Sequence, residues 1–167
     1  FNERNYLYLA DRGRIYGDVR LYDDQGTGIH FYTNREDTIA DQEMTVELSR
    51  IDLKQFKKVL PYLPAVEGWL GGSLHYVDSE GQMMLSADMN LDNFVYEKSP
   101  LGNWTMSGAY LPGDNNAHHV DGFITYNDQE IIYMNGVYQA NETGQENITG
   151  ELELQHFPLR VINPFIP

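Results

Sequence analysis

Residues 83–92 read MMLSADMNLD, and apolar side chains recur at every second position along this stretch. Met83, Leu85, Met89 and Leu91 share the odd positions, and polar side chains fill most of the even ones. A period of two is typical of a β-strand, because successive side chains point to opposite faces of a sheet. The stretch therefore predicts a strand with one apolar face and one wet face.

The same rhythm extends over most of the chain, interrupted by short turn signals such as Asp24-Gln25-Gly26 and Ser79-Glu80-Gly81. We expect about ten strands, and the short connections favour antiparallel neighbours. At ~4.8 Å per strand, such a sheet would be about 48 Å wide in the stacking direction. Three further runs carry the alternation clearly, namely Ile15, Val19 and Leu21, then Met44, Val46 and Leu48, then Ile148, Leu152 and Leu154.

One segment departs from this rhythm, and it predicts a short helix over residues 52–60. Asp52 is placed to cap the helix, and Gln55 follows three residues later. Pro61 and Pro64 come directly afterwards and would end it.

The helix-and-proline pattern occurs a second time near the C-terminus. Leu154 lies 103 residues after Ile51, and the two stretches that follow both carry spaced apolar residues and prolines. We interpret the chain as one β-rich module, residues 1–167, with repeat-unit boundaries near 48–64 and 151–167. The residues that correspond are Ile51, Phe56, Val59, Pro61, Leu63 and Pro64 in the first copy, and Leu154, Leu159, Ile162, Pro164, Ile166 and Pro167 in the second.

Composition excludes several classes of protein. The 11 basic and 25 acidic residues give a net charge of −14, so a general nucleic-acid binder is excluded, because phosphate binding needs a basic face. The chain has 0 cysteines, which excludes disulfides and thiolate metal sites. It contains no apolar run long enough for a membrane-spanning helix, so we expect membrane contact only through parts outside this sequence.

Three consecutive segments carry a resemblance to a known family. Leu48 to Phe56 reads LSRIDLKQF, Leu60 to Pro64 reads LPYLP, and Val66 to Leu74 reads VEGWLGGSL. Together they resemble the recurring short helix, proline-bearing exit and following strand of the TamB and AsmA-like envelope family. Leu154 to Pro167 is similar to the start of another such unit. Trp69 and the adjacent glycines depart from the pattern, and the rest of the chain agrees in strand texture alone.

The resemblance implies a fold, a location and a role. The implied fold is all-β: an elongated antiparallel sheet curved into a U-shaped apolar trough. It implies a periplasmic piece of a larger protein anchored in the inner membrane, and the start at Phe1 in polar sequence fits an excised piece. Family members are implicated in the assembly of outer-membrane proteins with an outer-membrane barrel partner, and in phospholipid transport between membranes.

We therefore expect a non-enzymatic module without cofactors, whose trough shelters lipid acyl chains or nascent outer-membrane protein strands. The implied partners are phospholipid or an outer-membrane protein substrate. The candidate binding residues form a surface and not a compact site. The predicted groove-lining residues are Val19, Leu21, Ile29, Phe31, Met44, Val46, Leu48, Leu70, Leu74, Met83, Leu85, Met89, Leu91, Trp104, Met106, Ile124, Leu152 and Leu154.

Other interpretations stay open from the sequence. A closed β-sandwich could bind glycans or proteins through external aromatics such as Trp69. His118, His119 and Asp121 could form a metal loop, although their spacing matches no standard zinc set. A glycosidase would need two carboxylates brought close together. The carboxylates considered for that role are Asp88, Asp92, Asp121 and Glu130.

Overall fold

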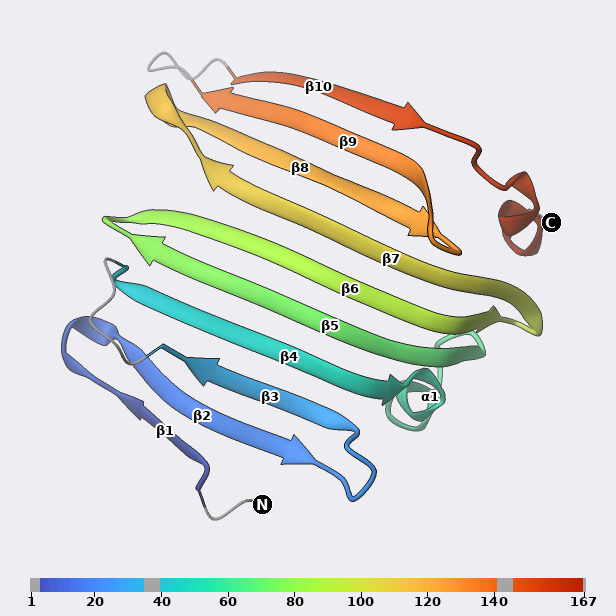
Figure 1. The fold of residues 1–167 in the computed structure, drawn as a ribbon, viewed down its shortest axis with the longest axis horizontal. Helices are drawn as coiled ribbons and strands as arrows, with labels where there is room; N and C mark the ends of the chain where they lie inside the picture. The colour runs from blue at the N-terminus through green and yellow to red at the C-terminus, as the bar shows by residue number, and fades with distance from the viewer. Residues whose placement is uncertain (1–3, 35–39, 141–145, 167) are drawn as a thin grey trace.

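The computed structural model describes residues 4–34, 40–140 and 146–166, and its strands form one open ten-stranded sheet. Every strand pairs with its neighbours in the sequence, and each pairing is antiparallel (Figure 1). The predicted fold class is confirmed. The strands are β1 (Tyr6–Leu9), β2 (Ile15–Tyr22), β3 (Gly28–Thr33), β4 (Gln42–Asp52), β5 (Val66–Ser79), β6 (Gln82–Tyr96), β7 (Ser99–Pro112), β8 (Ala117–Tyr126), β9 (Gln129–Ala140) and β10 (Glu146–Leu154).

The predicted helix near residues 52–60 is present between β4 and β5. It begins as a 3₁₀ turn, η2 (Leu53–Gln55), and continues as α1 (Phe56–Val59). The Asp52 side chain caps it by accepting hydrogen bonds from the Lys54 backbone N–H at 3.0 Å and the Gln55 side chain at 2.9 Å. Further 3₁₀ turns are η1 (Asp11–Gly13), η3 (Asp114–Asn116) and η4 (Leu159–Phe165).

The sheet is bent near the strand ends that lie beside α1 and η4. The regular pairing is interrupted there in three adjacent strands. The breaks lie between Leu48 and Ile51 in β4, between Glu67 and Trp69 in β5, and between Leu91 and Phe94 in β6. A β-bulge bends its strand and increases the local twist. A row of bulges across adjacent strands therefore curves the sheet as a whole.

Two glycines in β5 make this curvature sterically possible. Gly68 and Gly72 have φ of +133° and +132°, a region that favours glycine. A Cβ at Gly72 would lie 2.2 Å from the Asp88 carbonyl oxygen, and one at Gly68 would lie 2.9 Å from that of Asp92. Each position thus requires a residue without a side chain.

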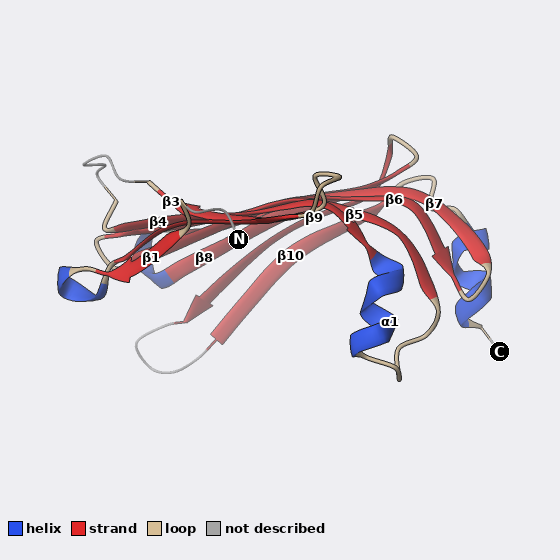
Figure 2. Cartoon of the chain, turned by 90° about the horizontal axis from the view of Figure 1, so that it is seen from below, coloured by secondary structure: helices blue, strands red, loops and turns tan. Residues whose placement is uncertain are grey.

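The helical segments α1 and η4 lie on the same side of the curved sheet, within its arch (Figure 2). We call this side the concave face and the other the convex face. The end of the sheet with α1 and η4 is the bent end, and the end with the β5–β6 and β7–β8 turns is the hairpin end. A short helical segment thus lies on the concave side at the bent end in each of the two predicted repeat boundaries. Pro167, the last residue of the second boundary, lies outside the described residues.

The alternative of a closed β-sandwich is wrong for the described part of the chain, because its strands belong to one sheet with no second sheet facing it. Few apolar side chains in this part are fully buried. They are Leu101, Ala117, Ile131 and Val161, between 1% and 9% exposed. Most apolar side chains of a single curved layer stay half-covered.

Candidate functional site: an apolar hollow on the concave face

Strand register decides which side chains share a face, since directly paired residues of antiparallel strands point the same way. On successive strands, Leu21 is paired with Ile29, Ile29 with Leu48, Leu48 with Gly72, and Gly72 with Met89. The pairing continues from Met89 to Met106, Ile124, Ile132 and Leu154. Side chains two positions apart on a strand point to the same face. Every predicted groove-lining residue from Val19 to Leu154 therefore lies on the concave face.

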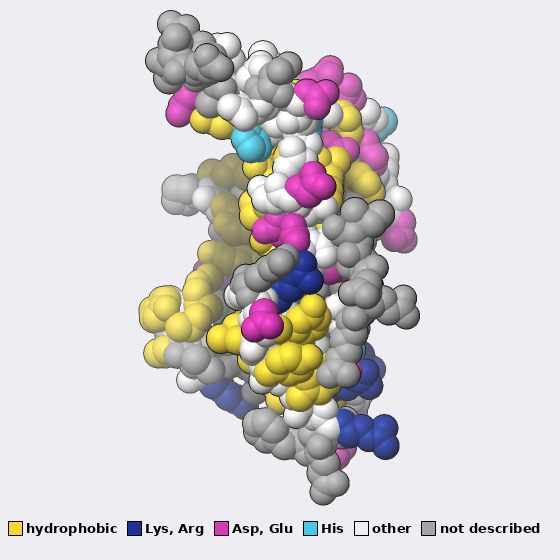
Figure 3. All heavy atoms as spheres, turned by 90° about the vertical axis from the view of Figure 1, so that its left-hand side faces the viewer, with side chains coloured by type: hydrophobic (Ala, Val, Ile, Leu, Met, Phe, Trp, Pro, Cys, Tyr) yellow, Lys and Arg dark blue, Asp and Glu magenta, His cyan; other side chains and the backbone are white. Residues whose placement is uncertain are grey.

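The concave face remains accessible over most of its area. Leu85 is 41% exposed, Met106 is 44% exposed and Leu152 is 64% exposed, although all are apolar. Figure 3, which looks along the strands, shows hydrophobic side chains gathered along the hollowed side of the arch. Contiguous exposed apolar patches are typical of surfaces that bind a ligand or a partner.

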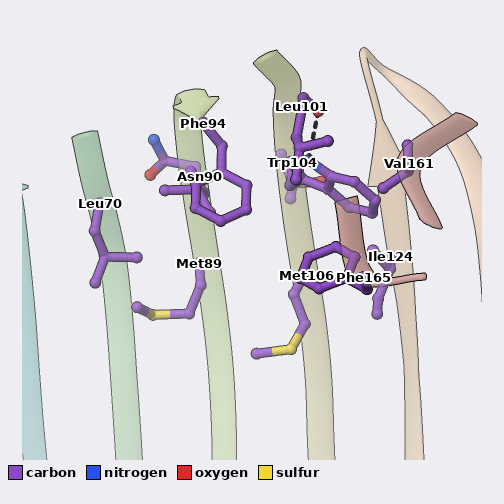
Figure 4. Close-up of a pocket in the computed structure, with 12 residues that line it drawn as sticks. Leu70, Met89, Asn90, Phe94, Leu101, Trp104, Met106, Ile124, Val161 and Phe165 are labelled. Carbon is purple, nitrogen blue, oxygen red and sulfur yellow. Dashed lines mark hydrogen bonds between the residues drawn. The ribbon is translucent and has the colours of Figure 1, made fainter. Parts of the chain in front are cut away.

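A hollow of about 400 Å³ lies at the bent end of this face, between strands β5 to β8 and the η4 segment. Figure 4 shows its lining side chains, and the accessible surface inside it is apolar throughout. The hollow brings together Leu70, Met89, Leu91, Trp104, Met106 and Ile124 from the predicted set. The other predicted residues extend the same face beyond the hollow.

Trp104 contributes apolar surface to the hollow because its polar atom is already bonded. Its indole Nε1–H donates to the Leu101 carbonyl oxygen at 2.8 Å. The Trp104 ring also meets the Tyr126 ring edge-on, with centroids 5.0 Å apart. Both contacts fix the indole in place, so it offers a rigid wall to an occupant.

The η4 segment forms the other side of the hollow through a few side chains. Val161 is 7% exposed, and the Phe165 ring lies 4.5 Å from the Tyr96 ring. Arg160 donates a hydrogen bond to the Tyr126 hydroxyl at 3.2 Å. The rest of the segment stays largely outside, since Leu159 is 72% exposed.

The hairpin end of the concave face is more polar. His118 lies between the rings of Tyr110 and Tyr138, with centroid distances of 5.6 Å and 5.9 Å. Burial and a hydrogen bond with Glu146 raise the pKa of Tyr138. The concave face therefore grades from aromatic and polar at this end to an apolar hollow at the bent end.

The convex face carries a hydrogen-bonded network. Asp18 pairs with Arg20 at 3.0 Å and with His30 at 2.9 Å, and His30 also lies 3.4 Å from Glu47. Burial raises the pKa of Asp18, but hydrogen bonds from Arg20 and His30 outweigh it and hold the pKa below 3.8. These groups satisfy one another on a surface open to water.

The metal interpretation finds no geometric support among the described residues, and the carboxylates of the glycosidase interpretation lie away from the hollow. His118 points to the concave face with Tyr110, while the consecutive His119 points to the convex face with Asp121. No group of three or more His, Asp or Glu side chains in this part of the chain could hold a metal ion. The register places the carboxylates considered for glycoside hydrolysis on the convex face, away from the hollow: Asp88, Asp92, Asp121 and Glu130.

Sequence reasoning missed several residues of the hollow. Phe94 and Leu101 follow breaks in the β6–β7 register, so simple alternation assigns them no face. Val161 and Phe165 come from η4, and the repeated helix-and-proline pattern was the signal that could have pointed to them.

Trp69 lies on the convex face, 38% exposed, with the Arg50 guanidinium 5.4 Å from its ring.

Among residues 4–34, 40–140 and 146–166, no helix has the length and apolar character needed to cross a membrane. No family model, curated protein or solved structure matches this chain.

Proposed function

We propose that this protein binds the acyl chains of lipids on its concave face, with the apolar hollow at the bent end as the principal site. The observation that carries the proposal is a hollow of about 400 Å³ with an apolar accessible surface, opening onto an exposed apolar face. Small-molecule sites commonly have volumes of ~300 to 1,000 Å³ and mostly hydrophobic walls. This hollow lacks accessible polar atoms, so it suits a hydrocarbon chain.

An acyl chain fits this surface better than a nascent protein strand does. An extended strand carries an N–H and a C=O at nearly every residue, and burial without hydrogen bonds is unfavourable for both. The walls around Met89 and Met106 offer no such partners. A hydrocarbon chain makes no such demand, so we favour lipid over an outer-membrane protein substrate.

Reversible binding also fits the physics. Burying a methylene group is worth ~0.8 kcal/mol, so about sixteen carbons contribute about 12 kcal/mol relative to water. A bilayer offers a similar amount, and a carrier has only to match it. The flexible methionines of the concave face, which include Met89 and Met106, adapt to a mobile chain.

The wider setting of this proposal rests on the family resemblance. We place the chain in a periplasmic protein of the bacterial envelope that serves outer-membrane biogenesis with an outer-membrane barrel partner. The role we assign is non-enzymatic, because the accessible surface of the proposed site is apolar and its lining contains no ionisable side chain.

A photoreactive fatty acid tests the proposal. The purified chain is irradiated with a diazirine-bearing palmitate, and the modified peptides are identified by mass spectrometry. We expect adducts in β6, β7 and η4, the segments around Met89, Met106 and Phe165. Adducts spread evenly over both faces, or none, would overturn the proposal.

A pair of matched variants sharpens this test. Met106→Asp places a charge on the concave face at a side chain that is 44% exposed, so the fold should tolerate it. Ser86→Asp adds the same charge on the convex face, opposite His75. We expect Met106→Asp to reduce labelling at least about tenfold, because a buried charge is unfavourable in an apolar site. Ser86→Asp should leave labelling unchanged.

A further inference from the structure

A second hollow adjoins the apolar one at the bent end. Its volume is about 360 Å³, and Leu101 and Val161 line both hollows; Figure 4 labels these two residues in the lining of the apolar hollow. The start of β7, the end of β8 and the η4 segment form its walls. We call it the polar hollow, because its lining includes the polar side chains of Ser99, Tyr126, Arg160 and Asn163.

Arg160 is the one charged side chain in this lining, and contacts with Tyr126 orient it. One guanidinium nitrogen donates a hydrogen bond to the Tyr126 hydroxyl at 3.2 Å. The guanidinium carbon lies 5.9 Å from the centre of the Tyr126 ring. A guanidinium carries several N–H donors, and this bond uses one of them. The remaining donors are therefore available to an anion that enters the hollow.

A pair of rings connects the polar hollow with the apolar one. Tyr126 lines the polar hollow, Trp104 lines the apolar hollow, and their rings meet edge-on at 5.0 Å. Arg160, Tyr126 and Trp104 thus form a continuous row of contacts from one hollow to the other. A ligand with its chain against Trp104 can therefore direct a head group toward the Arg160 guanidinium.

The charge of the surrounding chain favours an anion at this place. Lys98 and Arg160 are the only Lys or Arg residues between positions 61 and 167, whereas Asp and Glu are frequent there. Lys98 directly precedes Ser99 of the polar hollow, so both basic residues belong to or adjoin its lining. Most of this acidic surface repels anions, and the polar hollow is the place where local positive charge attracts them.

We infer that the polar hollow binds the anionic head group of the lipid, a carboxylate or a phosphate, while the acyl chain occupies the apolar hollow. This inference rests on the proposed function and adds the chemical class of the ligand. Arg160 supplies charge-assisted hydrogen bonds, which are stronger than neutral ones. The Ser99 hydroxyl and the Asn163 amide supply further donors. Arg160 is exposed, so water screens its charge and its contribution is moderate.

Two ligands with the same chain and different head groups test the inference. Dodecanoate carries a carboxylate, and dodecanol carries a neutral hydroxyl. Their dissociation constants are measured by isothermal titration calorimetry at concentrations below micelle formation. The quantity of interest is the ratio of the two affinities, because the contribution of the shared chain cancels in it.

Arg160→Gln removes the charge and keeps a side chain that can form hydrogen bonds. We expect the affinity for dodecanoate relative to dodecanol to fall by about three- to tenfold in this variant. Arg160→Lys keeps the charge and should retain part of the preference, since it lacks the planar guanidinium. Lys57→Gln is the matched control. It changes the net charge equally at an exposed side chain of α1 that lines neither hollow, and should leave the ratio unchanged.

The outcomes separate this inference from the proposed function. An unchanged ratio in Arg160→Gln, with both ligands still bound, would overturn the head-group site and leave the acyl-chain site in place. An equal fall in Lys57→Gln would trace the preference to net charge and also overturn it. Binding of neither ligand to the wild type would contradict the proposed function and this inference together.

Inorganic phosphate distinguishes a lipid head group from a free anion. Sodium phosphate is titrated into the wild type and into Arg160→Gln without lipid. We expect phosphate to bind far more weakly than dodecanoate, because it gains nothing from the apolar hollow. Phosphate binding as tight as that of dodecanoate, and lost in Arg160→Gln, would assign the polar hollow to a free anion and overturn the inference.

Discussion

The two ends of the concave face are built from the same strands but differ in almost every physical respect. At the bent end, bulges interrupt the strands, and Leu101, Ile131 and Val161 are nearly fully buried. At the hairpin end the pairing is regular, and Tyr110 and His118 bring polar atoms to the surface. Curvature, and not apolar composition alone, thus creates the hollow.

A single-layer sheet can thus form a hollow without a second sheet facing it. A flat stretch exposes its apolar side chains to water, whereas a curved stretch directs them toward a common volume. At the bent end the η4 segment covers that volume, with Val161 and Phe165 as its contacts. Variants that act on one end and spare the other can test each part of this account.

The largest effect is expected from Gly72→Val in β5. Its φ of +132° and the 2.2 Å approach of a Cβ to the Asp88 carbonyl oxygen leave no room for a side chain. Because clash and backbone strain add, we expect a loss of more than about 3 kcal/mol in unfolding free energy. Urea denaturation followed by tryptophan fluorescence measures this change.

Gly108→Ala is the control for that variant. Gly108 also lies on the concave face, but a Cβ there meets its nearest backbone atom at 3.3 Å, and its φ is not positive. We expect a change of less than about 1 kcal/mol. Equal losses from Gly72→Val and Gly108→Ala would contradict a special role for the bent region.

The next effect concerns the small core beneath η4. Leu101 is 4% exposed, and Leu101→Ala should lower the unfolding free energy by about 2 to 4 kcal/mol through lost burial and a residual cavity. Val120→Ala at the hairpin end should cost less than about 1 kcal/mol, because Val120 is already 43% exposed. Thermal unfolding of both variants measures the contrast, and equal losses would mean that the two ends are packed alike.

A smaller effect is expected on ligand binding from Phe165→Ala. Phe165 lines the hollow while remaining 54% exposed, so its removal should weaken fatty-acid binding by about three- to tenfold with little change in stability. Leu159→Ala removes an apolar side chain of the same segment that does not line the hollow. A fluorescent fatty-acid titration should show a weaker Kd for Phe165→Ala alone, and equal effects would place the ligand elsewhere.

The smallest effect lies on the convex face and depends on pH. The pKa of Asp18 lies below its ordinary value of 3.8, so its pairing stabilises the folded state above about pH 4. That contribution is lost as the pH falls through the folded-state pKa. We expect Asp18→Asn to be slightly less stable than the wild type at pH 6 and equal to it near pH 2, as measured by urea unfolding. A difference independent of pH would contradict this ion pair.

Most of the sheet could be predicted from alternation, because strand period fixes which side chains share a face. The residues of β6 from Met83 to Leu91 show this, and turn signals placed their neighbours in antiparallel order. The helix after β4 was predicted from Asp52 and the following prolines. These features depend on local chemistry, which a sequence displays directly.

The bulges and the closure of the hollow could not be predicted in this way. Arg50 and Asn93 adopt positive φ of 50° and 51°, although neither residue type requires it. Such conformations arise at breaks in the register between neighbouring strands, and the residue pattern does not mark where those breaks fall. Alternation also fails to show which face becomes concave. That Val161 and Leu101 line the same hollow was therefore not foreseeable from the residue pattern alone.

Methionine methyl NMR can locate a bound fatty acid on the sheet, because the methionine side chains report on both faces at once. The chain has 6 methionines, and the register places all except Met84 on the concave face. On titration with a medium-chain fatty acid, we predict large shifts for Met89 and Met106 in the hollow and none for Met84. Unchanged Met89 and Met106 signals, or shifts of Met84 as large as theirs, would contradict a lipid site on the concave face.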